Sequence, residues 1–422
     1  MKLFESLVKK TFSEIQKSFY QTAFVELTED LAIASARQID QLTESEQQKL
    51  PLIGKIFSVK DNINLQGYKS SVGNPYMPIL KASMHSVVVR NLLNAGAICI
   101  GKNHMNEFAA GLDGLNVHYK DLLNPVFSNA LTGGSSSGGA VAVSAGLVDF
   151  AIGSDTGGSA RVPACWNGIF GFRLPTSESD LDGLFPRSPT LDAIGVLAGR
   201  PELISSVYSA LKTNSHCHKL TSSENCKIGI VSESLAECAP GTQAMFYESL
   251  KNLQSTFCFS DLALPELREV NEASLAVLLF EFREVFLTRF PDQSFSFETL
   301  GPQVRSDLIR AKTISLPQRD NAISIIKKFS YELNSLMSDL DLIMMPLCRQ
   351  PAPNRTEKYS GDDLRAFTLP WSAAGYAVLA IPTIAIDSEN NRRPDGIQLI
   401  AKPEKTDILL SVGNLMKELL HG

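Results

Sequence analysis

The 422-residue sequence contains no run of roughly 18 or more apolar residues, which is the length that a membrane-spanning helix requires. Residues 1–19 carry lysine and glutamate too often for the apolar core of a signal peptide. The formal net charge is −6, whereas proteins that bind phosphate backbones need clustered lysine and arginine. The sequence therefore predicts a cytoplasmic protein with no membrane segment and no nucleic-acid partner.

Cysteine is also scarce. Seven cysteines are spread thinly along the chain, and their number is odd. Disulfide frameworks belong to small secreted domains with paired cysteines, so we expect reduced thiols here. The tripeptide His216-Cys217-His218 precedes Cys226, but this spacing fits no common zinc motif. We expect neither a metal nor another cofactor, and the sequence contains no internal repeat or low-complexity tract.

The chain does have enough apolar sequence for a large core, because 44% of its residues are hydrophobic. A helical pattern over 87–94 is followed by a strand pattern over 97–100, an alternation typical of α/β proteins. Residues 1–50 indicate an N-terminal helical layer or, alternatively, an amphipathic helix that binds a partner. We expect residues 51–422 to form a single domain with a variable, mainly helical region at about 205–340.

The most distinctive stretch runs from Gly133 to Pro163. Two glycine-serine loops, at 133–139 and 153–159, flank an apolar segment with a helical pattern and a short strand pattern. Glycine allows unusual backbone conformations and lets a ligand approach the main chain. A flexible, solvated linker is the alternative interpretation, but the segment between the loops is too apolar for one. The loops therefore predict a site made of backbone N–H groups and serine hydroxyls.

This stretch resembles the signature of the amidase signature family of serine hydrolases. The family pattern is a glycine-serine loop, then a small and apolar run, then Gly-x-Asp-x-Gly-x-Ser-aliphatic-Arg-x-Pro. One position differs from this pattern, because the chain has Ala160 where the family usually has a larger aliphatic residue. The resemblance extends from about residue 50 to the C-terminus and is weakest over 205–340. It implies an α/β fold, the α/β/α sandwich of this family, built around a large mixed β-sheet.

The resemblance also implies a catalytic triad. By motif position Ser159 is the nucleophile, and Ser135, held after a cis peptide bond, is the bridging serine. Ser136 and Ser137 are the neighbouring serines that an error of register would place there instead. Lys60 lies 75 residues before Ser135 at the end of an apolar strand, where the family has its catalytic lysine. Taken alone, Lys60 would be interpreted as a surface lysine whose stem packs on apolar side chains.

Further roles follow from the same resemblance. The oxyanion hole is expected to consist of the backbone N–H groups of Thr156, Gly157, Gly158 and Ser159. The substrate pocket is expected to include Met105, Phe108, Ser136 and Trp371. Asp155 and Arg161 are expected to form an internal ion pair that holds the second loop. We interpret His104 as a loop or surface histidine, because the family uses a lysine as its base.

The function that this resemblance implies is the hydrolysis of a small acyl or aryl-acyl amide to a carboxylate and ammonia or an amine, through an acyl-enzyme. Segments such as 116–119 and 147–150 look like plant-type indole-3-acetamide hydrolases, and the first serine loop is similar to the amidase part of allophanate hydrolases. The amidase subunit of a tRNA-dependent amidotransferase is one alternative. A non-catalytic interaction module with this fold is another. We expect a small-molecule amide substrate and a monomer or homodimer.

Overall fold

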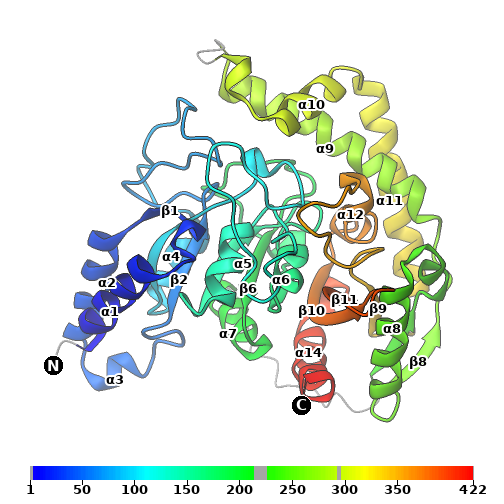
Figure 1. Ribbon diagram of the computed structural model, residues 1–422, viewed down its shortest axis with the longest axis horizontal. Coiled ribbons are helices and arrows are strands. Elements are labelled where there is room, and N and C mark those ends of the chain that lie inside the picture. The colour runs from blue at the N-terminus through cyan, green and yellow to red at the C-terminus, as the bar shows by residue number, and fades with distance from the viewer. Residues whose placement is uncertain (1–2, 213–225, 292–295, 422) are drawn as a thin grey trace.

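The computed structural model describes residues 3–212, 226–291 and 296–421 (Figure 1). Within these residues eleven strands form one sheet in the order β1-β3-β2-β4-β6-β5-β10-β11-β9-β7-β8. The sheet is mixed, because β2 runs parallel to β3 and β4 while β10 and β11 are antiparallel. The strands are β1 (Phe24–Leu27), β2 (Ile56–Lys60), β3 (Ile98–Asn103), β4 (Phe150–Ser154), β5 (Phe170–Arg173), β6 (Ile194–Ala198), β7 (Lys227–Ile230), β8 (Cys258–Asp261), β9 (Leu342–Pro346), β10 (Ala377–Ile386) and β11 (Arg392–Ala401).

Helices cover both faces of the sheet. They are α1 (Leu3–Lys17), α2 (Glu29–Gln41), α3 (Glu44–Gln47), α4 (Val87–Asn94), α5 (Ser137–Ser144), α6 (Arg161–Trp166), α7 (Pro201–Leu211), α8 (Pro240–Leu253), α9 (Leu267–Arg289), α10 (Pro302–Ala311), α11 (Leu316–Leu336), α12 (Gly361–Arg365), α13 (Leu369–Ala373) and α14 (Thr406–His421). Among these helices of the described chain, none has the length and apolar character that crossing a bilayer would require.

The buried side chains of the strands separate into two layers, since successive residues of a strand point to opposite faces. In β9, Leu342 and Met344 belong to the core formed with α4, α7, α8 and α14. Ile343 and Met345 belong to the core formed with α9 and α11. Helices α1, α2, α5 and α6 form the remaining core of this second face. The predicted α/β/α sandwich around a large mixed sheet is confirmed.

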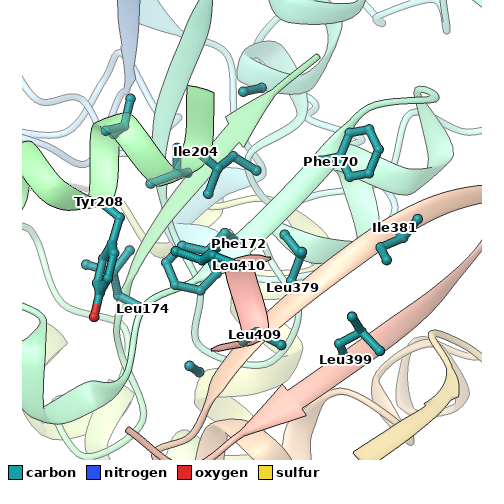
Figure 2. Packing of buried hydrophobic residues seen from close by; sticks show 14 of the residues in the cluster. Phe170, Phe172, Leu174, Ile204, Tyr208, Leu379, Ile381, Leu399, Leu409 and Leu410 are labelled. Atoms are coloured by element: carbon teal, nitrogen blue, oxygen red, sulfur yellow. The ribbon is translucent and has the colours of Figure 1, made fainter. Parts of the chain in front are cut away.

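The first of these cores shows why the layers hold together (Figure 2). Phe172 of β5 and Leu379 of β10 lie under α7 and α14, and Phe172 meets the ring of Tyr208 edge to face at 5.5 Å between centroids. Each fully buried leucine or phenylalanine stabilises the fold by about 1.5–3 kcal/mol relative to an exposed one. The sheet is therefore a rigid platform for the loops at its edge.

Three parallel strands bring the segments of the candidate site together. Because β2 runs parallel to β3 and β4, the carboxyl ends of these strands meet at one edge of the sheet. Lys60 is paired with Asn103 at that edge, and Ser154 ends the strand on the other side. Ligand sites in α/β sheets commonly lie outside the carboxyl ends of parallel strands.

Residues 3–50 are mainly helical, but they also contain one strand that the sequence did not predict. The segment Phe24–Leu27 forms β1, which pairs antiparallel with β3 at one edge of the sheet. Its four residues are all half-buried. A segment of this length is too short to show the alternation of apolar and polar residues that predicts a strand. It becomes a strand because it pairs with β3, and this pairing cannot be predicted from periodicity. At the opposite edge, β7 and β8 interrupt the region 205–340, whose described residues otherwise contribute mainly helices.

Candidate active site

Lys60, the last residue of β2, is buried with 1% of its side chain exposed. Its Nζ donates a hydrogen bond to Ser135 Oγ at 2.7 Å and to Ser154 Oγ at 2.9 Å. A third contact joins it to the carbonyl oxygen of Ser154 at 3.3 Å. Lys60 is therefore held between the first serine loop and the end of β4, and it is not the surface lysine that its strand-end position alone would suggest.

Burial decides the charge of Lys60. Removal of water from the ammonium group lowers the pKa of Lys60 to about 7. The negative charges of Asp155 and Asp192 act in the opposite direction, but burial outweighs them. A substantial fraction of Lys60 is consequently uncharged near neutral pH and can accept a proton.

The first serine loop presents only one of its serines to Lys60. The peptide bond between Gly134 and Ser135 is cis, as predicted. The backbone N–H of Ser136 donates to the carbonyl of Ser159 at 3.0 Å, which ties the two loops together. The Ser136 hydroxyl donates to the Ser154 carbonyl at 3.4 Å. The Ser135 hydroxyl is thus the one that contacts Lys60.

Asp155 organises the second loop. Its carboxylate accepts hydrogen bonds from the backbone N–H groups of Gly158 at 2.7 Å and Ala160 at 3.1 Å. The Arg161 guanidinium donates to both carboxylate oxygens, at 2.9 and 3.0 Å, so the predicted ion pair is confirmed. Burial would raise the pKa of Asp155, but Arg161 and the backbone donors outweigh it and hold that pKa well below its usual range. Asp155 therefore stays ionised and fixes the loop that carries Ser159.

One of the four groups predicted for the oxyanion hole is occupied. The N–H of Gly158 is bonded to Asp155, so it is not free for an oxyanion. Among the described residues, no acceptor binds the N–H groups of Thr156, Gly157 or Ser159. Gly158 instead serves the turn itself: its φ is +117°, and a Cβ there would lie 2.6 Å from Thr368 Oγ1.

Asp192, which precedes β6, supports the same loop from the other side. Its Oδ1 accepts the hydroxyl of Thr156 at 2.6 Å, and its Oδ2 accepts the backbone N–H of Arg187 at 2.8 Å. Burial raises the pKa of Asp192 to about 6. Asp192 is not among the site residues that the sequence predicts.

A cavity of about 20 Å³ lies against Ser159, which is room for about one water molecule. It is lined by Ala109, Gly111, Leu112, Thr156, Gly157, Ser159, Arg187, Leu278 and Arg365. None of the four residues predicted for the substrate pocket lines this cavity in the described part of the chain.

Two of the four predicted pocket residues pack into the core instead. Trp371 is fully buried, with its ring centroid 6.4 Å from that of Phe329 on α11. Phe108 is buried among the aromatic side chains of α9, 5.9 Å from Phe282 between ring centroids. A motif locates a segment near the site, but the backbone decides which side chains face it. The neighbour of Phe108, Ala109, lines the cavity, and both have a left-handed φ, of 48° and 55°.

The other two predicted pocket residues are also directed elsewhere. Met105 is fully buried, and its carbonyl accepts a hydrogen bond from Asn116 at 2.7 Å. Ser136 is buried with its hydroxyl on the Ser154 carbonyl. Met105 and Ser136 therefore support the loops around the site without reaching the cavity.

His104 is in a loop after β3, but the prediction that it could lie on the surface is wrong. Its side chain is 1% exposed, and its Nδ1 lies 3.0 Å from the hydroxyl of Ser137. Burial lowers the pKa of His104 to about 4, so the imidazole is neutral at pH 7. His104 contacts a serine of the first loop, but this serine is not the one that contacts Lys60.

Sequence reasoning also missed the arginines of the cavity. Arg187 and Arg365 lie in segments without a catalytic motif, so no local pattern marks them. Ser154 had a weak signal, because it stands at the end of an apolar strand and precedes Asp155. As for metals, the described residues contain no group of three or more His, Cys, Asp or Glu side chains that could hold an ion. Residues 216–218 lie outside the described part of the chain.

Comparisons with known proteins identify the family to which the chain belongs. The family model described as Amidase matches residues 6–410. The chain is 28% identical to mandelamide hydrolase of Pseudomonas putida over 452 aligned positions, which cover 98% of this chain and 88% of that protein. It is 29% identical to a glutamyl-tRNA(Gln) amidotransferase subunit of Methanococcus maripaludis over 393 positions, covering 89% and 88% of the two chains.

A second hydrolase and a solved structure are also similar to this chain. Indoleacetamide hydrolase of Pseudomonas savastanoi is 32% identical over 253 positions, which cover 60% of this chain and 54% of that protein. A crystal structure described as amidase superimposes with a TM-score of 0.88 at 25% identity, covering 99% of this chain and 96% of the other. The family model spans nearly the whole chain and includes both serine loops and Lys60. The protein therefore belongs to the amidase signature family and is an amidase.

Proposed function

We propose that this amidase hydrolyses a small acyl or aryl-acyl amide to a carboxylate and ammonia or an amine, with Ser159 as nucleophile, Ser135 as bridging serine and Lys60 as base. The observation that carries the proposal is the 2.7 Å contact between Lys60 Nζ and Ser135 Oγ in a buried site. Because burial lowers the pKa of Lys60 to about 7, the amine can act as a base near neutral pH.

The first half of the reaction is a proton relay. Neutral Lys60 takes the proton of the Ser135 hydroxyl, and Ser135 in turn takes the proton of the Ser159 hydroxyl. The Ser159 oxygen forms a bond to the carbonyl carbon of the amide, and the electron pair of the C=O double bond moves to the oxygen. The N–H groups of Thr156, Gly157 and Ser159 are free to stabilise this oxyanion, since only that of Gly158 is bonded to Asp155.

The second half releases both products. The C–N bond breaks, and the nitrogen leaves as ammonia or an amine with a proton from Ser135, which recovers one from Lys60. The acyl group is then an ester on Ser159. Water attacks this ester and gives a proton to Ser135, whose own proton passes to Lys60. The bond between the acyl carbon and Ser159 Oγ then breaks, Ser159 recovers a proton from Ser135, and Ser135 recovers one from Lys60. The acid leaves and loses its proton to solvent as a carboxylate, so the enzyme ends unchanged.

The relatives support an amide with an acyl or aryl-acyl group. The names of two of them, mandelamide hydrolase and indoleacetamide hydrolase, describe hydrolysis of amides whose acyl group carries an aromatic ring. Burial of a lysine destabilises the fold, and a non-catalytic interaction module would not need the contact between Lys60 and Ser135. This contact therefore favours the enzyme over the interaction module.

A second candidate function is the amidase subunit of a tRNA-dependent amidotransferase. The similarity to the glutamyl-tRNA(Gln) amidotransferase subunit covers 89% of the chain, so it necessarily extends beyond residue 205. The weaker motif match over 205–340 therefore does not separate the two candidates. Purification of the tagged protein from its own cells tests it. A stoichiometric partner subunit, in a complex that hydrolyses glutamine, would favour the amidotransferase, and a monomer or homodimer would favour the free amidase.

The proposed hydrolysis is tested by ammonia release from aryl-acetamides, aliphatic amides, glutamine and allophanate. Wild-type protein should release ammonia from at least one class, and a phosphonofluoridate probe should label it. Ser159→Ala should lose both the activity and the label while its circular dichroism is unchanged, because one loop hydroxyl contributes little to stability. Labelling of Ser159→Ala at wild-type level would show that another residue is the nucleophile.

A further inference from the structure

The cavity beside Ser159 is lined by two arginines and has no aromatic wall. Its only charged lining residues in the described chain are Arg187 and Arg365, and the others are alanine, glycine, leucine, threonine and serine. No carboxylate among the described residues lines it. An aryl group would find no aromatic partner in this cavity, whereas a small anion would find two guanidinium groups.

Arg187 is held rigidly beside the second serine loop. Its backbone N–H donates to Asp192, the carboxylate that also binds the hydroxyl of Thr156. Its guanidinium lies 3.6 Å from the ring centroid of Phe282, and Nη2 is bonded to Asp307. These contacts come from three different segments, so the position of Arg187 is fixed by the fold before any ligand binds.

One end of the Arg187 guanidinium has no partner. The side chain is 4% exposed, and its Nη1 is buried without a hydrogen-bond acceptor among the described residues. A buried charged donor without an acceptor is unfavourable. Because Arg187 also lines the cavity, a carboxylate oxygen of a ligand would satisfy this donor.

Arg365, the last residue of α12, supplies the second positive charge. It is half-buried, and its Nε donates to the carbonyl of Gly361 at 3.1 Å. No carboxylate of the described residues forms an ion pair with Arg365. Burial is the main factor that lowers the pKa of Arg187, and the nearby positive charge of Arg365 lowers it further. The two guanidinium groups therefore repel each other, and an anion bound by both would offset the repulsion.

Arg365 is shared between the cavity and a larger groove. It lines both the small cavity and a neighbouring groove of about 690 Å³. Because the cavity holds about one water molecule, an acyl group enters only when a lining side chain moves. The groove itself has more carboxylates than guanidinium groups: Glu233, Glu237, Glu266, Glu272, Asp362 and Asp363 against Arg268, Arg349 and Arg365. An anionic group is therefore favoured at the arginine pair and disfavoured in the groove.

We infer that Arg187 and Arg365 form an anion subsite beside Ser159, which binds a carboxylate on the acyl part of a small amide substrate. The inference narrows the substrate class of the proposed hydrolysis and rests on that function for its catalytic consequence. Binding of the carboxylate itself does not require turnover, so the subsite can be tested separately from the reaction.

Binding is measured by calorimetry with the Ser159→Ala protein and two small amides of similar size. Succinamate carries a carboxylate, and 4-oxopentanamide carries a neutral acetyl group in its place. Succinamate should bind more tightly, and Arg365→Gln should weaken its binding roughly 10- to 100-fold, as expected for loss of a charged hydrogen-bond partner. Arg310→Gln is the matched control, because Arg310 is exposed, lies on α10 near Asp362 and does not line the cavity.

Hydrolysis is measured with otherwise wild-type protein on the same pair of amides and on phenylacetamide. The ratio of kcat/KM for succinamate to that for 4-oxopentanamide should exceed roughly 10 and should fall at least tenfold in Arg365→Gln. Arg365→Lys should retain part of the preference, since it keeps the charge and loses the planar fork. Arg310→Gln should retain all of it.

Different results would contradict the anion subsite and the proposed hydrolysis. Equal binding of the two amides, preference for phenylacetamide, or equal effects of Arg365→Gln and Arg310→Gln would overturn the anion subsite while leaving the amidase reaction intact. Tight binding of succinamate to Ser159→Ala, with no amide hydrolysed by the wild type, would support the subsite and contradict the proposed hydrolysis.

Discussion

Lys60 Nζ lies 2.7 Å from Ser135 Oγ, and neither side chain has more than 1% of its surface exposed. A lysine in such a place is expensive while it is charged, because burial removes the water that stabilises an ammonium group. The same burial lowers the pKa of Lys60 to about 7. The feature that weakens the fold is thus the one that would make Lys60 a base.

Exchange of single serines tests which hydroxyl bridges Lys60 and the nucleophile. Ser135→Ala should lower kcat by several orders of magnitude, because it removes the group through which protons would pass. Ser136→Ala is the matched control and should cost less than about tenfold, since its hydroxyl only donates to the Ser154 carbonyl at 3.4 Å. A larger loss in Ser136→Ala than in Ser135→Ala would show that the assigned register is wrong.

Lysine and histidine are compared directly by Lys60→Ala and His104→Ala. Lys60→Ala should abolish the relay and reduce kcat by at least about 10³-fold. His104→Ala should cost much less, because His104 contacts Ser137 rather than Ser135. Both variants should keep the wild-type circular dichroism spectrum. Equal loss of activity in the two folded variants would rule out the lysine-based mechanism.

Asp192 is a positioning residue, and its effect should appear in the pH profile. Its negative charge raises the pKa of Lys60, so Asp192→Asn should lower that pKa and move the acidic limb of kcat/KM to lower pH. Loss of the charged acceptor for Thr156 should also reduce kcat roughly tenfold. Asp387→Asn, in an exposed turn, should change neither quantity. A lower kcat with an unmoved acidic limb would indicate a purely structural role.

The burial of Lys60 should also make stability depend on pH. Between the folded pKa of about 7 and the unfolded value of 10.5, the unfolded chain binds more protons at this residue, so stability rises with pH. Relative to Lys60→Met, the free energy of unfolding of the wild type should increase by roughly 3 kcal/mol from pH 7 to pH 9.5. Urea unfolding of both proteins at the two pH values measures this, and a constant difference would show that Lys60 is not desolvated.

The sequence predicted the parts of the site that lie in local motifs. The two serine loops and Lys60 each belong to a short motif. The cis bond before Ser135 and the ion pair of Asp155 with Arg161 were predicted from the same motifs. The fold class followed too, because alternating helix and strand periods are properties of short segments.

What the sequence did not show depends on contacts between distant segments. Arg187 and Arg365 line one cavity only because the segment before β6 and the end of α12 are brought together by the fold, and no residue near either of them in the sequence indicates this. Trp371 is a residue type that often lines substrate pockets, but its position on α13 directs its side chain into the core against Phe329. The partner of the Gly158 N–H likewise appears only when the loop is folded around Asp155.

The pH dependence of kcat/KM tests the central claim, that a neutral buried lysine is the base. On any amide that the wild type hydrolyses, kcat/KM should rise with pH through a single ionisation near pH 7, as Lys60 loses its proton, and should stay high to about pH 10. The rise should be absent from the residual activity of Lys60→Ala. A profile that is flat between pH 6 and 8, or a rise in Lys60→Ala identical to that of the wild type, would contradict the claim.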